Sequence, residues 1–156
     1  MSKRLDGKVA VIIGAGCVGP GWGNGRATAF RFVEEGASVL AVDNSKEALL
    51  ETIERVAPLD GVMETYIGDA TKSQSVSSMI ATCMNRFGRL DILVNNVGGS
   101  KKGGPVDLSE EDWDSQIDQN LKSVFLGCKY AIPELEKDGG GAIVNIASTS
   151  GTRWTG

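Results

Sequence analysis

The chain has 156 residues, of which 41% are hydrophobic and 23% charged, so its composition is that of a folded domain and not of a disordered segment. Its formal net charge of -4, without a basic cluster, argues against a nucleic-acid partner. It contains no histidine, which excludes Ser-His-Asp and Cys-His catalysis and the common zinc sites, and we expect no metal. Three widely spaced cysteines indicate reduced thiols and a cytoplasmic protein. No apolar run has the length of a membrane span, so we expect no membrane partner.

Short runs rich in valine and isoleucine alternate with longer amphipathic segments along the chain. The runs are near-continuous, as in strands buried on both faces, and they predict strands at Val9 to Ile13, Ser38 to Val42, Thr65 to Ile67, Ile92 to Val94 and Ala142 to Ile146. The amphipathic segments predict helices over 24–35, 44–56, 71–87 and 109–132, the last kinked or ended by Pro133. This alternation predicts an α/β fold, namely a Rossmann-type doubly wound parallel sheet in three αβα layers, as one domain over residues 1–156.

Six glycines crowd the twelve residues 14–25, directly after the first expected strand. A strand, a glycine turn and a helix N-terminus together form a site for a pyrophosphate. The frame Gly14-x-Gly16-x-x-Gly19 matches the dinucleotide fingerprint, but a helix starting there would enclose several glycines at roughly 1 kcal/mol each. We therefore prefer a frame in which the helix begins near Asn24, after Gly23.

Asp43 follows the second expected strand, where a dinucleotide fold needs a carboxylate that accepts hydrogen bonds from the adenosine ribose. A carboxylate at this point would also repel a 2′-phosphate, and Asn44 and Ser45 follow it where an arginine would favour that phosphate. The sequence thus favours NAD over NADP as cofactor. The alternative interpretation of Asp43 is an ordinary turn residue at a strand end.

Three segments together resemble the short-chain dehydrogenase/reductase family, and the resemblance extends over nearly the whole chain. Gly14 with Gly23-Asn24-Gly25-Arg26 is similar to the family's glycine motif, with five additional residues in the loop. Asp69-Ala70 resembles its acidic pair at the adenine ring, and Asn95-Asn96-Val97-Gly98 its N-N-A-G motif. The resemblance implies an NAD(P) site formed by Gly14, Gly23, Asn24, Gly25, Asp43, Asp69, Ala70, Asn96 and Gly98.

Two further residues carry implied catalytic roles. Asn120 lies on the apolar stripe of the fourth expected helix, so we expect its amide to be buried and bonded, and a core asparagine bonded to backbone is one explanation. The resemblance implies instead the family's active-site asparagine, which holds a water in the proton relay. Ser148 resembles the catalytic serine, whose hydroxyl bonds the substrate oxygen. Ser150 is the alternative serine, and an ordinary strand-end turn is the alternative structure.

The resemblance implies an NAD(P)-dependent oxidoreductase that transfers a hydride between nicotinamide and a small secondary alcohol or ketone. The family's general acid/base is a tyrosine followed by a lysine four residues on, and no Tyr-x-x-x-Lys occurs in this sequence. We therefore expect a chain truncated at its C-terminus, whose full-length form is a homo-oligomer, a dimer or a tetramer. The competing hypothesis is a non-catalytic dinucleotide-binding module or an inactive fragment.

Overall fold

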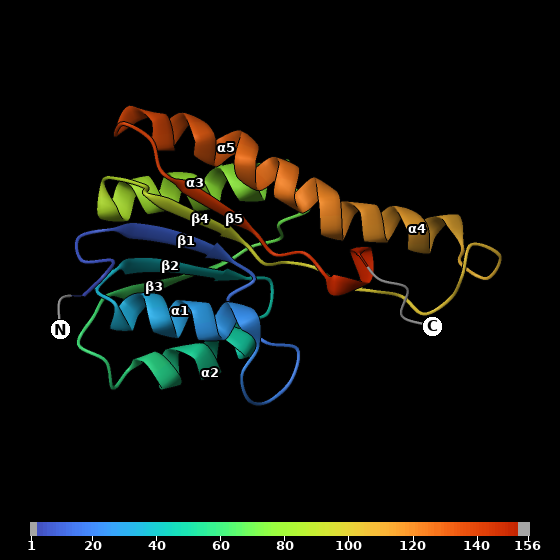
Figure 1. Ribbon diagram of the computed structural model, residues 1–156, viewed down its shortest axis with the longest axis horizontal. Helices are drawn as coiled ribbons and strands as arrows, with labels where there is room; N and C mark the ends of the chain where they lie inside the picture. The colour runs from blue at the N-terminus through green and yellow to red at the C-terminus, as the bar shows by residue number, and fades with distance from the viewer. Residues whose placement is uncertain (1–2, 153–156) are drawn as a thin grey trace.

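A computed structural model describes residues 3–152 as one parallel five-stranded sheet with helices on both faces (Figure 1). The strands are β1 (Val9–Ile13), β2 (Ser38–Asp43), β3 (Met63–Ile67), β4 (Ile92–Asn95) and β5 (Ala142–Asn145). The helices are α1 (Asn24–Glu34), α2 (Lys46–Val56), α3 (Ser73–Phe87), α4 (Glu110–Ile117) and α5 (Ser123–Lys137). The strand order β3-β2-β1-β4-β5 confirms the Rossmann-type doubly wound fold.

Successive residues of the central strands face opposite helical layers. On one face, Val11 and Leu93 pack with side chains of α3 and α5 such as Met79. On the other face, Ile12 packs with side chains of α1 and α2 such as Val33. Because both faces are covered, β1 is buried along its whole length, as the continuous apolar run predicts.

The two outer strands are more exposed than the sequence predicts. β3 has only half-buried and exposed residues, and β5 is exposed except for half-buried Ile143. Each of them pairs with one described neighbour only, β3 with β2 and β5 with β4. The prediction of burial on both faces is therefore wrong for these strands, because they lie at the edges of the described sheet.

The helix starts differ slightly from the predicted ones. α1 begins at Asn24, as expected, and Gly36, with a φ of +93°, follows its end. α2 is capped by Ser45, whose hydroxyl accepts a hydrogen bond from the Ala48 N–H at 3.1 Å, and α3 begins at Ser73. The predicted ranges begin at the expected capping residues, Asn44 and Thr71, and the observed N-cap residues, Ser45 and Lys72, each lie one residue later.

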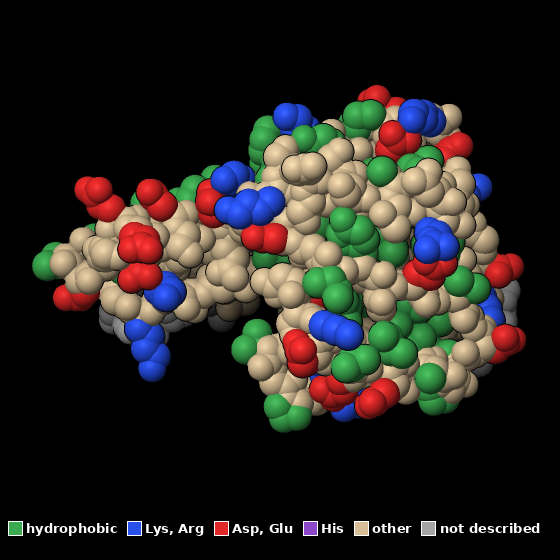
Figure 2. Space-filling view, turned by 180° about the vertical axis from the view of Figure 1, so that it is seen from behind, with side chains coloured by type: hydrophobic (Ala, Val, Ile, Leu, Met, Phe, Trp, Pro, Cys, Tyr) green, Lys and Arg blue, Asp and Glu red, His purple; other side chains and the backbone are tan. Residues whose placement is uncertain are grey.

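The fourth predicted helix is divided into α4, a π-helical segment at Asp118–Lys122, and α5. Pro133 does not end it, since α5 continues to Lys137 and buried Leu135 holds its last turn against the core. α4 extends beyond the sheet as an arm (Figure 1), and Figure 2 shows acidic side chains on this arm. As a result, the apolar side chains of α4, which belong to the apolar stripe of the fourth predicted helix, are not covered by any other described helix or strand.

Candidate functional site

The chain crosses from one half of the sheet to the other between β1 and β4, and a cleft of about 420 Å³ opens at the carboxyl ends of the strands there. In open α/β sheets, ligands bind at this position. Six of the predicted cofactor residues line the cleft: Gly14, Asp43, Asp69, Ala70, Asn96 and Gly98. Gly23, Asn24, Gly25, Asn120 and Ser148 do not line it.

The loop after β1 is packed so tightly that glycine is required in it. Gly14 has a φ of +87°, and a Cβ on it would lie 2.9 Å from the backbone nitrogen of Val97. A Cβ on Gly25 would overlap the Gly14 carbonyl oxygen, which also accepts a hydrogen bond from Asn96 Nδ2 at 2.8 Å. The glycine loop, the start of α1 and the segment after β4 thus contact one another directly.

The N-terminus of α1 follows this loop, and no side chain caps it with a hydrogen bond. Gly23 is the N-cap residue, and the first turn carries no acidic side chain. The first N–H groups of a helix have no intrahelical acceptor, and the helix dipole makes this end partly positive. This end of α1 has the polarity that an anionic group requires.

Asp43 lies at the end of β2 and is bonded to the glycine loop. Its Oδ2 accepts a hydrogen bond from the Gly16 N–H at 2.9 Å, and its Oδ1 accepts one from the Ser45 N–H at 3.0 Å. A Cβ on Gly16 would lie 2.7 Å from the same Oδ2. These bonds hold the carboxylate at the wall of the cleft. The bond to the Ser45 N–H is also what an ordinary turn residue at a strand end would make, which was the alternative interpretation of Asp43.

Asp69 lies two residues beyond the end of β3 and lines the same cleft. Its Oδ1 accepts hydrogen bonds from the N–H of Thr71 at 2.8 Å and from its hydroxyl at 2.7 Å. Partial burial raises the pKa of Asp69, but these hydrogen bonds outweigh it, and the pKa lies below its ordinary value. Asp69 is consequently ionised at neutral pH, and Ala70 beside it is buried.

Asn95, the last residue of β4, and Asn96, which follows it, have different surroundings. The Nδ2 of Asn95 donates to Asn145 Oδ1 on β5 at 2.8 Å, while its own buried Oδ1 has no hydrogen-bond partner among residues 3–152. Asn96 faces the cleft and bonds the Gly14 carbonyl. Asn95 therefore links β4 to β5, and Asn96 fixes the glycine loop.

Asn120 is exposed, so the prediction that its amide is buried is wrong. It lies in the π-helical segment, and its amide is bonded to backbone, with Oδ1 accepting from Gly99 N–H at 3.0 Å and Nδ2 donating to Gly99 O and Gln116 O, both at 2.9 Å. The physical reason is the position of α4, which extends beyond the sheet and leaves this part of the stripe uncovered (Figure 1). Asn120 thus ties the segment after β4 to the helix.

Ser148 is exposed on the segment after β5. Its hydroxyl accepts a hydrogen bond from the Ser150 N–H at 3.1 Å and caps a short 3₁₀ turn at Thr149–Gly151. This is the strand-end turn of the alternative interpretation, and the bond leaves the Ser148 hydroxyl proton available for donation.

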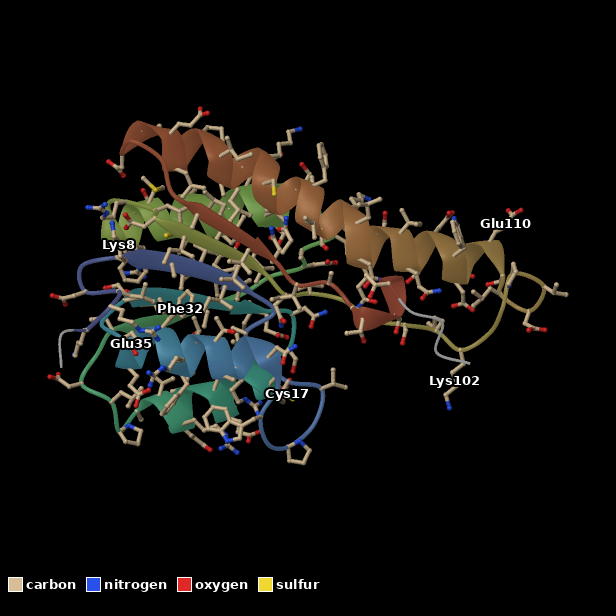
Figure 3. The ribbon with its side chains drawn as sticks, in the orientation of Figure 1. Lys8, Cys17, Phe32, Glu35, Lys102 and Glu110 are labelled. Atoms are coloured by element: carbon tan, nitrogen blue, oxygen red, sulfur yellow. The ribbon has the colours of Figure 1, made fainter. Side chains whose placement is uncertain are left out.

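Several residues that line the cleft were missed by sequence reasoning. Cys17 and Val18 come from the additional part of the glycine loop, and Figure 3 shows Cys17 beyond the carboxyl end of the sheet. Asn44 and Ser45, named above only as residues that favour NAD, also line the cleft, and their place after a strand end was a usable signal for this. Gln119 also lines the cleft, but the π-helical segment that carries it interrupts the helical period, so the sequence pattern gave no signal for it.

The family model described as short chain dehydrogenase matches residues 8–155. The chain belongs to this family. A 3-oxoacyl-(acyl-carrier-protein) reductase, FabG, of Thermotoga maritima is 37% identical over 95% of this chain and 58% of its own length. A 7alpha-hydroxysteroid dehydrogenase of Escherichia coli is 36% identical over 93% of this chain and 54% of its own length.

Solved structures of this dehydrogenase family superpose closely. A crystal structure from Burkholderia xenovorans, described as that of a short-chain dehydrogenase/reductase, has a TM-score of 0.96 and 55% identity over 99% of this chain and 61% of that one. A 7 alpha-hydroxysteroid dehydrogenase complexed with NADH and 7-oxo glycochenodeoxycholic acid has a TM-score of 0.88 and 34% identity over 97% of this chain and 57% of that one. The chain thus spans little more than half the length of the relatives that it matches. Within residues 3–152, no helix is both long and apolar enough to cross a membrane.

Proposed function

We propose that this chain carries the nucleotide-binding part of an NAD-dependent oxidoreductase that acts on secondary alcohols or ketones. The observation that carries the proposal is the Asp43 carboxylate, held at the wall of a cleft at the sheet's switch point. The glycine loop and the uncapped α1 are the parts that such a site uses for a pyrophosphate. When bound, the nicotinamide supplies or accepts the hydride.

The residues present fit an adenine dinucleotide. Gly14 and Gly16 line the cleft, and a Cβ on either would meet protein atoms beside it, so the cleft wall there is formed by backbone, as a pyrophosphate site requires. A carboxylate suits the ribose hydroxyls of NAD and disfavours the 2′-phosphate of NADP. Ionised Asp69 adds a second acceptor on the same cleft, where the resemblance implies the adenine ring.

The catalytic assignment rests on Ser148. An exposed serine that keeps its hydroxyl proton free can donate a hydrogen bond to a substrate oxygen as charge changes at the carbonyl carbon. We assign Asn120 a supporting role, because its side chain holds the backbone of Gly99 beside the cleft residue Gly98. Neither role requires a metal ion.

We also propose that the protein forms a homo-oligomer. Large apolar side chains are exposed along α4, the π-helical segment and α5, namely Trp113, Ile117, Leu121, Phe125 and Ile132. Contiguous exposed apolar side chains are typical of protein interfaces. A second copy of this chain is the partner that we expect to cover them.

Turnover tests the proposal directly. The protein at its full length, incubated with NAD and a panel of secondary alcohols, should form NADH, and NADP should support a lower kcat/KM. Saturable NADH binding without turnover on any alcohol or ketone would favour the non-catalytic module. Preference for NADP would contradict the role of Asp43.

A further inference from the structure

The glycine loop contains a segment that the nucleotide site alone does not explain. Residues 17–21 are additional to the family motif, yet Cys17 and Val18 form part of the cleft wall. Val18 is fully exposed, so its own packing does not hold it in place. The segment must be held from its other side, where it meets α2.

Arg26 is the buried residue at the base of this segment. Its side chain is 1% exposed, and one NH1 group both donates to the Gly21 carbonyl and pairs with Glu51 Oε2 at 2.7 Å. Its Nε donates to the Thr52 hydroxyl at 3.2 Å, and its NH2 donates to the Ala48 carbonyl at 3.2 Å. A buried guanidinium is tolerated only when it is paired and hydrogen-bonded in this way.

Glu51 completes the connection from the opposite side. Its Oε1 accepts a hydrogen bond from the Gly21 N–H at 3.2 Å, so Arg26 and Glu51 together bind both backbone groups of Gly21. Arg55 lowers the pKa of the Glu51 carboxyl below its ordinary value through hydrogen bonds of 3.0 and 2.7 Å. Glu51 is thus ionised at neutral pH.

Two aromatic side chains, Trp22 and Phe30, pack beside the charged side chain of Arg55. The guanidinium of Arg55 lies 4.5 Å from the ring centre of Trp22, and Trp22 packs edge-on against Phe30 at 5.3 Å. The loop is therefore attached to α2 at two consecutive residues, Gly21 and Trp22. Thr52 extends the attachment inward, since its hydroxyl lies 3.0 Å from the Ala15 carbonyl oxygen.

We propose that Arg26 and Glu51 are positioning residues for the nucleotide, which hold residues 17–22 against α2 so that the cleft wall is formed before the ligand binds. The inference rests on the proposed function. Ordering a loop residue costs roughly 1 kcal/mol or more of conformational entropy, and an unanchored loop would have to be ordered by the ligand itself. The apparent affinity is the intrinsic affinity multiplied by the fraction of molecules in which the wall is already formed, so a smaller fraction gives weaker binding.

The test compares Glu51→Gln with Glu54→Gln in the full-length protein. Glu54 is on the same helix, is exposed, and makes no side-chain hydrogen bond or salt bridge with any residue between 3 and 152. Glu51→Gln should raise the Kd for NADH about tenfold and the KM for NAD similarly, with kcat at saturating NAD changed less than twofold. Glu54→Gln should match the wild type.

Chymotrypsin cleavage after Trp22 gives a second readout that does not depend on activity. Cleavage should be faster in Glu51→Gln than in the wild type and in Glu54→Gln. Arg55→Met is the second variant, because it removes the contacts with Trp22 and Glu51 without touching the buried guanidinium of Arg26. Arg55→Met should also raise the Kd for NADH and speed the cleavage after Trp22.

The possible failures are distinguishable. If the wild type binds NADH and both variants bind it equally well, the positioning role is overturned while the proposed function stands. Unchanged cleavage after Trp22 in both variants would overturn the anchoring of the loop. If the wild type binds no NADH, the proposed function and the positioning role both fail.

Discussion

Replacing Ser148 with alanine should lower kcat of the full-length protein by about 10²- to 10³-fold, the usual effect of removing a hydrogen bond made to a transition state. The Kd for NADH should change less than twofold, because Ser148 does not line the nucleotide cleft. Steady-state kinetics with an alcohol substrate, together with an NADH titration, measure both quantities. The combination separates a role in the reaction from a role in cofactor binding.

Ser150→Ala is the matched control for this substitution. Ser150 donates only its backbone N–H to the Ser148 hydroxyl, so alanine at position 150 keeps that bond. Its kcat should stay within twofold of the wild type. The opposite pattern, with a large loss in Ser150→Ala and little in Ser148→Ala, would transfer the catalytic role to Ser150.

Gly25→Ala should lower the free energy of unfolding by about 3 kcal/mol and weaken NADH binding as well. The added Cβ would overlap the Gly14 carbonyl oxygen and approach Asn96 Nδ2, so the Gly14 to Asn96 hydrogen bond would be lost in addition to the overpacking. Urea unfolding measures the first effect. An NADH titration under native conditions measures the second.

Gly19→Ala is the control, because a Cβ on Gly19 meets nothing within 4 Å. Gly19 is exposed in the same loop, so this variant tests whether an added methyl group alone matters. Its free energy of unfolding should lie within about 0.5 kcal/mol of the wild type. Equal stability of Gly25→Ala and Gly19→Ala would contradict the packing described for Gly25.

Much of the fold was predictable because the central strands are buried on both faces. β1 and β2 are near-continuous apolar runs, and their bounds agree with the predicted ones within one residue. The start of α1 at Asn24 followed from the cost of glycine inside a helix. Asp43 was found for a similarly local reason, since it directly follows the last apolar residue of its strand.

The failures have a common physical cause, which is that burial depends on which neighbours are present. An apolar stripe at helical spacing predicted a buried Asn120, but α4 extends beyond the sheet and has no described layer above it (Figure 1). The exposure of β5 follows from its edge position, which the strand's own sequence does not encode. The contacts of Arg26 join residues far apart in the chain, from Gly21 to Glu51, and sequence spacing does not reveal them.

The most direct test of the account is a calorimetric titration of the full-length protein and of Asp43→Ala with NADH and with NADPH. We expect saturable binding of one NADH per chain and weaker binding of NADPH. We expect an NADH affinity at least about tenfold lower in Asp43→Ala, which loses the carboxylate acceptor and its bonds to Gly16 and Ser45. Absence of saturable NADH binding by the wild type, or tighter binding of NADPH than of NADH, would contradict it.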